Sequence, residues 1–249
     1  MPKQPKLRIF AGPNGSGKTT LFDSIKSEYF STKLFVNADF LEEAFKKYGF
    51  INLSDFNIVV AHQAFDEFCT KSGLFKKAKF NNISWGLIIK ENVIVKQDQV
   101  NEAIYNSYHF AIVADFIRQE LIRNRISFSF ETVFSHPSKL DLIDFAHLNN
   151  YKIYLYFIGT ETPIMNLERV KDRVKKGGHP VEEEKIQSRY FLTMELLTEM
   201  IKKADETYLW DNSGIKHQYL GNVKKGIIEF EQATIPKWID TFILNKLKL

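Results

Sequence analysis

The sequence predicts an α/β protein in which a parallel sheet carries helices on both faces. Short, continuously apolar stretches typical of buried strands alternate along the chain with amphipathic stretches typical of helices. In the stretch "RIFAGPNGSGKTT", an apolar strand runs through a loop with three glycines into a helix-like segment. Strands that are joined through helices pair in parallel. A chain of 249 residues is long enough for one sizeable core, so we expect one domain with an insertion.

The apolar periodicity places the elements of this domain in order. Strands are expected at 7–11, at about 34–36, and at 126–134, 152–160 and 206–213, the last of which we take as the final strand. Helices are expected at 19–26, 41–48, 107–123, 137–150, 163–176 and 182–203. The sequence therefore predicts a strand followed by a helix, repeated along the chain.

The pattern changes at about 52–100, and we interpret this segment as an insertion. A helix is expected over Phe56–Cys69, followed by a loop at Ser72 and Gly73. The stretch "WGLIIKENVIVK" predicts a hairpin that turns at Glu91 and Asn92. We expect the insertion to cap the core or to shape a substrate pocket, and not to form a separate domain.

The composition is that of an ordinary folded protein in a reducing compartment. The 34 basic and 30 acidic residues leave a charge of +4, so no nucleic-acid partner is expected. A single cysteine excludes an internal disulfide, and no cysteines and histidines stand at zinc spacing. Without a secretory signal or an apolar run of membrane-spanning length, we expect a cytoplasmic protein with no membrane partner.

The glycine-rich loop matches the Walker A pattern G-x-x-x-x-G-K-[ST] between a strand and a helix, the context that the pattern requires. In such a loop backbone N–H groups surround a phosphate, the lysine reaches the β- and γ-phosphates, and the hydroxyl holds Mg²⁺. The sequence therefore predicts a site for ATP and Mg²⁺, with Thr19 as the metal ligand. The predicted nucleotide-binding residues are Gly12, Pro13, Asn14, Gly15, Ser16, Gly17, Lys18, Thr19 and Thr20.

Polar side chains follow the carboxyl ends of the strands, where the chemistry of a parallel α/β sheet gathers. Asp39 follows the second strand and is either a general base for an acceptor hydroxyl or the N-cap of the next helix. Glu131 stands in an apolar stretch, so its carboxylate needs a partner. That partner is a substrate hydroxyl, Mg²⁺ through water, or a structural arginine. Asp211 and Asn212 follow the fifth strand, and we place Asn212 at the nucleotide.

Arginines flank a second glycine-containing segment, "KKGGHPV". Gly177 and Gly178 would make this segment a mobile lid, whose arginines neutralise charge that develops on a transferring phosphoryl group. A solvent-exposed helix face is the more common explanation for any one arginine, but the position of Arg173 and Arg189 at the edges of the lid favours the catalytic role, which we predict for both. His179 either contacts the substrate or belongs only to the loop.

Six stretches together resemble the zeta toxin family of P-loop kinases: "GPNGSGKTT", "NAD" at 37–39, "FETVFSHPSK" at 130–139, "RVKDRVKKGGH" at 169–179, "IQSRY" at 186–190 and "DNS" at 211–213. The resemblance implies a three-layer P-loop fold and transfer of a phosphate from ATP to a hydroxyl of UDP-N-acetylglucosamine. It also implies an antitoxin partner, Asp39 as base, Glu131 at the substrate, and Arg173 and Arg189 at phosphates. The best-studied toxins have Thr and Arg where this chain has Val133 and Ser135, so the acceptor stays open.

Two other functions remain alternatives to a small-molecule kinase. A switch or motor ATPase would need a carboxylate directly after "KIYLYFIG", and this chain has none there. The stretch "DNSG" fits the D-x-x-G pattern of GTPase switches, but the N-K-x-D motif that recognises guanine does not follow it. A polynucleotide kinase would need a basic groove, for which only "LFKKAKF" is a candidate.

Overall fold

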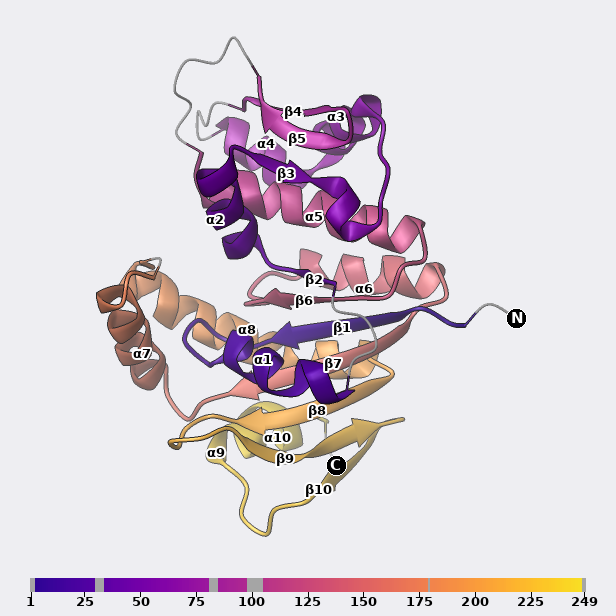
Figure 1. Ribbon diagram of the computed structural model, residues 1–249. Coiled ribbons are helices and arrows are strands. Elements are labelled where there is room, and N and C mark those ends of the chain that lie inside the picture. Colours follow the sequence, from indigo (N-terminus) through magenta and orange to yellow (C-terminus); the bar gives the residue numbers. More distant parts are fainter. Residues whose placement is uncertain (1–2, 30–33, 81–84, 98–104, 179, 248–249) are drawn as a thin grey trace. The chain divides into compact units, whose positions relative to one another are not determined.

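Figure 1 shows the computed structural model, which describes residues 3–29, 34–80, 85–97, 105–178 and 180–247. The chain forms two compact units, one of residues 1–33 with 129–249 and one of residues 34–128. The expected insertion at 52–100 lies within the second unit. That these units make up a single domain stays a prediction.

The first unit is built on a mostly parallel sheet. Its strands are β1 (Lys6–Ala11), β6 (Phe128–Thr132), β7 (Lys152–Gly159), β8 (Glu206–Asp211), β9 (Gln218–Lys224) and β10 (Ile227–Phe230). They follow the order β10-β9-β8-β7-β1-β6. β1, β7 and β8 pair in parallel, whereas β9 and β10 are antiparallel. Every residue of β1 except Lys6 is buried, as expected for a strand covered on both faces.

Helices cover both faces of this sheet (Figure 1). They are α1 (Lys18–Tyr29), α6 (Ser138–Leu148), α7 (Pro163–Lys175) and α8 (Glu183–Lys203), followed by the C-terminal turns α9 (Lys237–Ile239), η2 (Asp240–Leu244) and α10 (Asn245–Leu247). On one face Phe22 of α1 meets Phe10 of β1 edge to face, with ring centroids 5.2 Å apart. On the other face Trp238 packs on Phe157, and η2 packs against α8. The expected α/β fold is confirmed.

The second unit combines helices with a small antiparallel sheet. Its elements are β2 (Phe35–Val36), α2 (Ala38–Tyr48), β3 (Phe50–Asn52), η1 (Leu53–Phe56), α3 (His62–Lys71), α4 (Gly73–Phe80), β4 (Leu87–Lys90), β5 (Val93–Lys96) and α5 (Ser107–Arg123). The sheet order is β3-β5-β4. Glu91 and Asn92 turn the β4–β5 hairpin with φ angles of 51° and 63°, so the expected hairpin is confirmed. The Asn92 amide also donates to Ser54 and to the Ile58 carbonyl.

Several boundaries differ from the sequence prediction for local reasons. The helix expected from Phe56 begins six residues later, at His62, because Asn57 adopts a left-handed conformation that ends η1. The loop expected at Ser72 and Gly73 is reduced to Ser72, whose extended backbone ends α3. Gly73 already belongs to α4, and Ser72 Oγ accepts a hydrogen bond from Phe75 N in its first turn.

The strand at 206–213 is also not the last one. Two further antiparallel strands, β9 and β10, follow it, and β3 was not expected either. Each of these strands is short or polar, so its apolar periodicity is weak. None of the helices described here has the length and hydropathy needed to cross a membrane.

Candidate active site

The glycine-rich loop joins β1 to the N-terminus of α1. Gly15 and Gly17 have φ angles of 75° and 88°, which favour glycine. Space is a second constraint, because a Cβ on Gly15 would lie 2.5 Å from the Asn166 carbonyl oxygen. A Cβ on Gly17 would lie 2.6 Å from the Asn212 amide nitrogen. The loop therefore packs closely against residues that follow β7 and β8.

Lys18 is folded back over this loop and is only 5% exposed. Its ammonium group donates a hydrogen bond to the Pro13 carbonyl oxygen at 2.8 Å. The same nitrogen lies 3.8 Å from Glu131 Oε1. A buried cation is costly unless it is paired, so the carbonyl and the carboxylate together stabilise the charge.

Glu131 contacts the next residue of the loop as well. Thr19 Oγ1 donates to Glu131 Oε2 at 2.6 Å, across 112 residues of sequence. The carboxylate is 17% exposed and lies on β6, next to β1 in the sheet. The partners of Glu131 that the structure identifies are thus a lysine and a threonine. The structural arginine considered from the sequence stays a prediction.

The opposite side of the loop is held by three side chains that donate to backbone carbonyls. Asn166 Nδ2 donates to Asn14 O at 2.6 Å, and Asn212 Nδ2 donates to Ser16 O at 2.9 Å. His217 Nε2 lies 3.1 Å from Gly17 O. Sequence reasoning identified Asn212, as a nucleotide ligand, but missed Asn166 and His217, which no pattern in the chain distinguishes. A direct contact of Asn212 with a nucleotide stays a prediction.

His217 is a neutral donor at ordinary pH. Burial lowers the pKa of its imidazole below the usual value, and the nearby charge of Arg169 lowers it further. The Gly17 carbonyl opposes these effects by accepting a hydrogen bond. Because a carbonyl can only accept, the hydrogen of the neutral ring must lie on Nε2.

Asp211, at the end of β8, anchors the segment that carries Asn212. Its carboxylate accepts hydrogen bonds from Trp238 Nε1 at 2.8 Å and from the backbone and hydroxyl of Ser213 at 2.9 and 2.8 Å. The backbone N–H of Asn212 donates to Gly159 O at 2.9 Å. These bonds fix the direction from which the Asn212 side chain reaches the loop.

Three polar atoms at or beside the loop are buried and have no hydrogen-bond partner among the described residues. They are Asn14 Oδ1, Ser16 Oγ and Arg169 Nη1. Most buried polar atoms in folded proteins are satisfied, so such atoms point to a ligand or ordered water. A phosphate could accept from the hydroxyl and from the guanidinium. The donors present therefore suit an anionic ligand.

Asp39 belongs to the second unit, where it lies exposed in the first turn of α2. The N-cap of this helix is Asn37, whose Oδ1 accepts from Asp39 N at 2.8 Å. The capping role considered for Asp39 thus belongs to Asn37. The role of Asp39 as a base stays a prediction.

The residues of the predicted lid lie on α7 and α8. Arg173 is exposed in the last turn of α7, and Arg189 is half-buried on α8. Gly177, with a φ of 89°, follows the end of α7, and Gly178 N donates to Arg173 O at 3.0 Å. His179 lies outside the described residues. Contact of these arginines with a phosphate stays a prediction.

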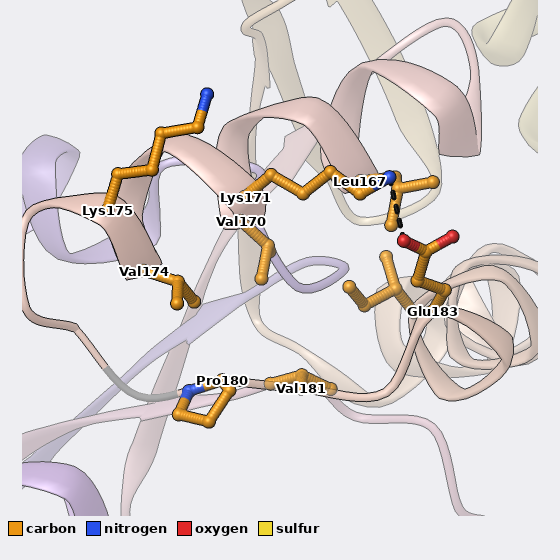
Figure 2. A pocket seen from close by; sticks show the side chains of 9 residues that line it. Leu167, Val170, Lys171, Val174, Lys175, Pro180, Val181 and Glu183 are labelled. Atoms are coloured by element: carbon orange, nitrogen blue, oxygen red, sulfur yellow. Dashed lines mark ion pairs between the residues drawn. The ribbon is translucent and has the colours of Figure 1, made fainter.

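A cavity of about 340 Å³ lies between α7 and the start of α8 (Figure 2). Its apolar lining comes mainly from Val170, Val174, Val181 and Ile186. Figure 2 shows the ion pair of Lys171 with Glu183, 2.7 Å long, that joins the two helices beside it. None of its lining residues belongs to the glycine-rich loop, so the cavity is a feature of the packing of α7 against the start of α8.

The chain is similar in sequence to one known protein and similar in structure to several. No protein-family model matches the chain. An uncharacterized protein of Haemophilus influenzae is 32% identical over 83 residues, which cover 33% of this chain and 52% of that protein. The chain thus spans about half the length of this relative.

Among solved structures, AvrRxo1-ORF1:AvrRxo1-ORF2 with sulphate ions superimposes with a TM-score of 0.52 at 16% identity, over 97% of this chain and 64% of the other. The structure of the same complex with ATP gives a TM-score of 0.50 at 16% identity, over 97% and 64%. A structure of the PezAT toxin–antitoxin system of Streptococcus pneumoniae gives 0.44 at 12% identity, over 86% and 72%. The two AvrRxo1 structures show that the chain shares their fold.

Proposed function

We propose that the protein is an ATP-dependent kinase that transfers a phosphoryl group to a hydroxyl of a small molecule. The observation that carries this proposal is the contact of Lys18 and Thr19 with Glu131 at the mouth of the glycine-rich loop. A buried ammonium, a hydroxyl and a carboxylate at a helix N-terminus are the groups that hold a nucleoside triphosphate and its metal ion. A structure with this fold and ATP supports the choice of nucleotide.

The oxygen donors of the site fit Mg²⁺. This ion prefers oxygen ligands and is usually bound through one or two protein groups together with substrate phosphates. Thr19 Oγ1 would bind it directly, and Glu131 would bind it through water. When bound, Mg²⁺ supplies positive charge to the phosphate oxygens.

The residues of the chain then divide the work of the transfer. Lys18 exchanges its bond with Pro13 O for the β- and γ-phosphates and neutralises their charge. Asp39 takes the proton of the acceptor hydroxyl while that oxygen forms a bond to the γ-phosphorus and the bond to the ADP oxygen breaks. Arg173 and Arg189 stabilise the charge on the transferring group.

The finer proposals concern the acceptor and a partner. The resemblance to zeta toxins suggests an amino sugar attached to UDP as acceptor, and an antitoxin as partner. A complex of two proteins in the structurally similar AvrRxo1-ORF1:AvrRxo1-ORF2 supports the second suggestion. A partner of this kind would be found by purifying the tagged chain together with the product of a neighbouring gene.

Two lysines of α1 provide a matched test of the kinase. Lys18→Ala removes the buried lysine, whereas Lys26→Ala removes a lysine of the same helix that is 46% exposed. With ATP, Mg²⁺ and a metabolite extract, we expect ADP formation to fall at least a hundredfold in the first variant and to stay within about twofold in the second. Equal turnover by both folded variants would refute the assignment of the loop.

A further inference from the structure

We propose that Asn166, Asn212 and His217 are positioning residues, whose hydrogen bonds to backbone carbonyls hold the glycine-rich loop in an anion-binding conformation. We name these three side chains the carbonyl clamp. The inference rests on the proposed function, because it concerns how this chain binds the phosphates of a nucleotide. It assigns roles to two residues, Asn166 and His217, that neither the loop pattern nor the resemblance identifies.

The direction of the loop peptides follows from the clamp. In a planar trans peptide the C=O and N–H bonds point in opposite directions. The clamp draws the carbonyls of Asn14, Ser16 and Gly17 toward the side chains that follow β7 and β8. The N–H groups that share those peptides, of Gly15, Gly17 and Lys18, are therefore directed to the opposite side, where an anion would lie.

Each clamp residue is itself fixed in one orientation. Thr160 Oγ1 donates to Asn166 Oδ1, which leaves the amide nitrogen of Asn166 facing Asn14 O. Tyr190 in turn donates to the Thr160 carbonyl at 2.6 Å. Asn166 and Thr160 are both fully buried, so this chain of bonds is shielded from water.

The other two clamp residues act on adjacent carbonyls. Asp211, which holds Trp238 and Ser213, fixes the backbone beside Asn212. His217 contributes the N–H of a neutral ring to Gly17 O, an oxygen that also accepts the first helical bond from Leu21 N at 3.0 Å. The start of α1 and the end of the loop are thus held at the same atom.

Loss of one clamp donor should weaken phosphate binding more than it weakens the fold. A loop released at one carbonyl would populate its binding conformation only part of the time, and the apparent dissociation constant rises by the inverse of that fraction. We expect an effect on the order of tenfold for one donor, which is about 1.4 kcal/mol. His217 is the best residue to vary, because it is half-buried and substitution there leaves the buried Thr160–Asn166 bonds intact.

The experiment compares two substitutions of His217 in the full chain. His217→Phe keeps a ring but removes the donor, whereas His217→Gln restores an N–H at a similar reach. Calorimetric titration with ADP and Mg²⁺ should show a dissociation constant about tenfold higher for the Phe variant and within about threefold of wild type for Gln. The melting temperatures of the three nucleotide-free proteins should stay close together.

The outcomes separate the clamp from the kinase assignment. If the wild type binds ADP and the Phe variant binds it equally well, the clamp is refuted and the proposed function stands. If both substitutions weaken ADP binding equally, the N–H donor at this position does not account for the effect and the clamp is also refuted. If the wild type does not bind ADP, the proposed function fails, and the clamp fails with it.

Discussion

Replacing Glu131 by glutamine probes the charge at the centre of the site. Glutamine still offers an oxygen to Thr19 Oγ1 but removes the negative charge that lies 3.8 Å from the Lys18 ammonium. At an effective dielectric constant of about 20, two unit charges about 4 Å apart attract each other by about 4 kcal/mol. Lys18 is 5% exposed, so solvent compensates little for the lost partner.

The expected cost is smaller than this attraction. Breaking a buried pair usually costs about 3–5 kcal/mol, but Lys18 keeps its bond to Pro13 O and Glu131 is 17% exposed. We therefore expect the free energy of unfolding to fall by about 2–3 kcal/mol. For a protein of this size the melting temperature should then fall by about 4–12 °C. Saturating ADP places new negative charge beside Lys18, so it should reduce the difference in melting temperature between the wild type and Glu131→Gln.

The assay is differential scanning calorimetry with and without ADP, and Glu42→Gln is its control. Glu42 is similarly buried, at 8% exposed, but its partner Lys46 is 53% exposed, so its loss should cost only about 0–1 kcal/mol. A Glu131→Gln protein that melts no lower than the Glu42→Gln protein would refute the reasoning. So would a decrease in melting temperature that ADP does not reduce.

Three further predictions concern catalysis and pH. Asp39→Asn should leave the melting temperature nearly constant, because Asn37 caps α2, while phosphorylation falls about a hundredfold or more; normal product formation would exclude Asp39 as the base. Arg173→Ala and Arg189→Ala should lower kcat more than they lower the affinity for ATP. An unchanged kcat in both variants would show that neither arginine acts in the transfer. His217, whose pKa is lowered on folding, stabilises the protein above its ordinary pKa of 6.5 and progressively less as the pH falls below it. His217→Gln should make the melting temperature fall less steeply as the pH is lowered below 6.5. An unchanged pH dependence of the melting temperature would contradict the lowered pKa of His217.

The fold and the loop could be predicted because their signals are local. The glycines, Lys18 and Thr19 stand together in the sequence, and the buried strands around them are continuously apolar. The strands at the sheet edge carry weaker signals. β10, for example, has only four residues, of which Ile227 is 65% exposed. Periodicity therefore does not identify such a strand.

The partners inside the site were harder to predict because they depend on strand order. Thr19 and Glu131 meet only because β6 lies beside β1 in the sheet. Likewise, His217 reaches Gly17 across 200 residues, from a segment between two strands of which the second was not expected. A single sequence shows that Glu131 needs a partner, but the sheet topology decides which one it finds.

The central claim, transfer of phosphate to a small-molecule hydroxyl, is tested most directly by following the γ-phosphate of labelled ATP. The full chain would be incubated with γ-labelled ATP, Mg²⁺ and a metabolite extract, and the products separated and weighed by mass spectrometry. We predict that one molecule of a labelled, phosphorylated metabolite forms for each molecule of ADP, and that the Lys18→Ala variant forms no labelled metabolite. Label that appears only as inorganic phosphate, in equal amount to ADP, would contradict the kinase and identify a hydrolase.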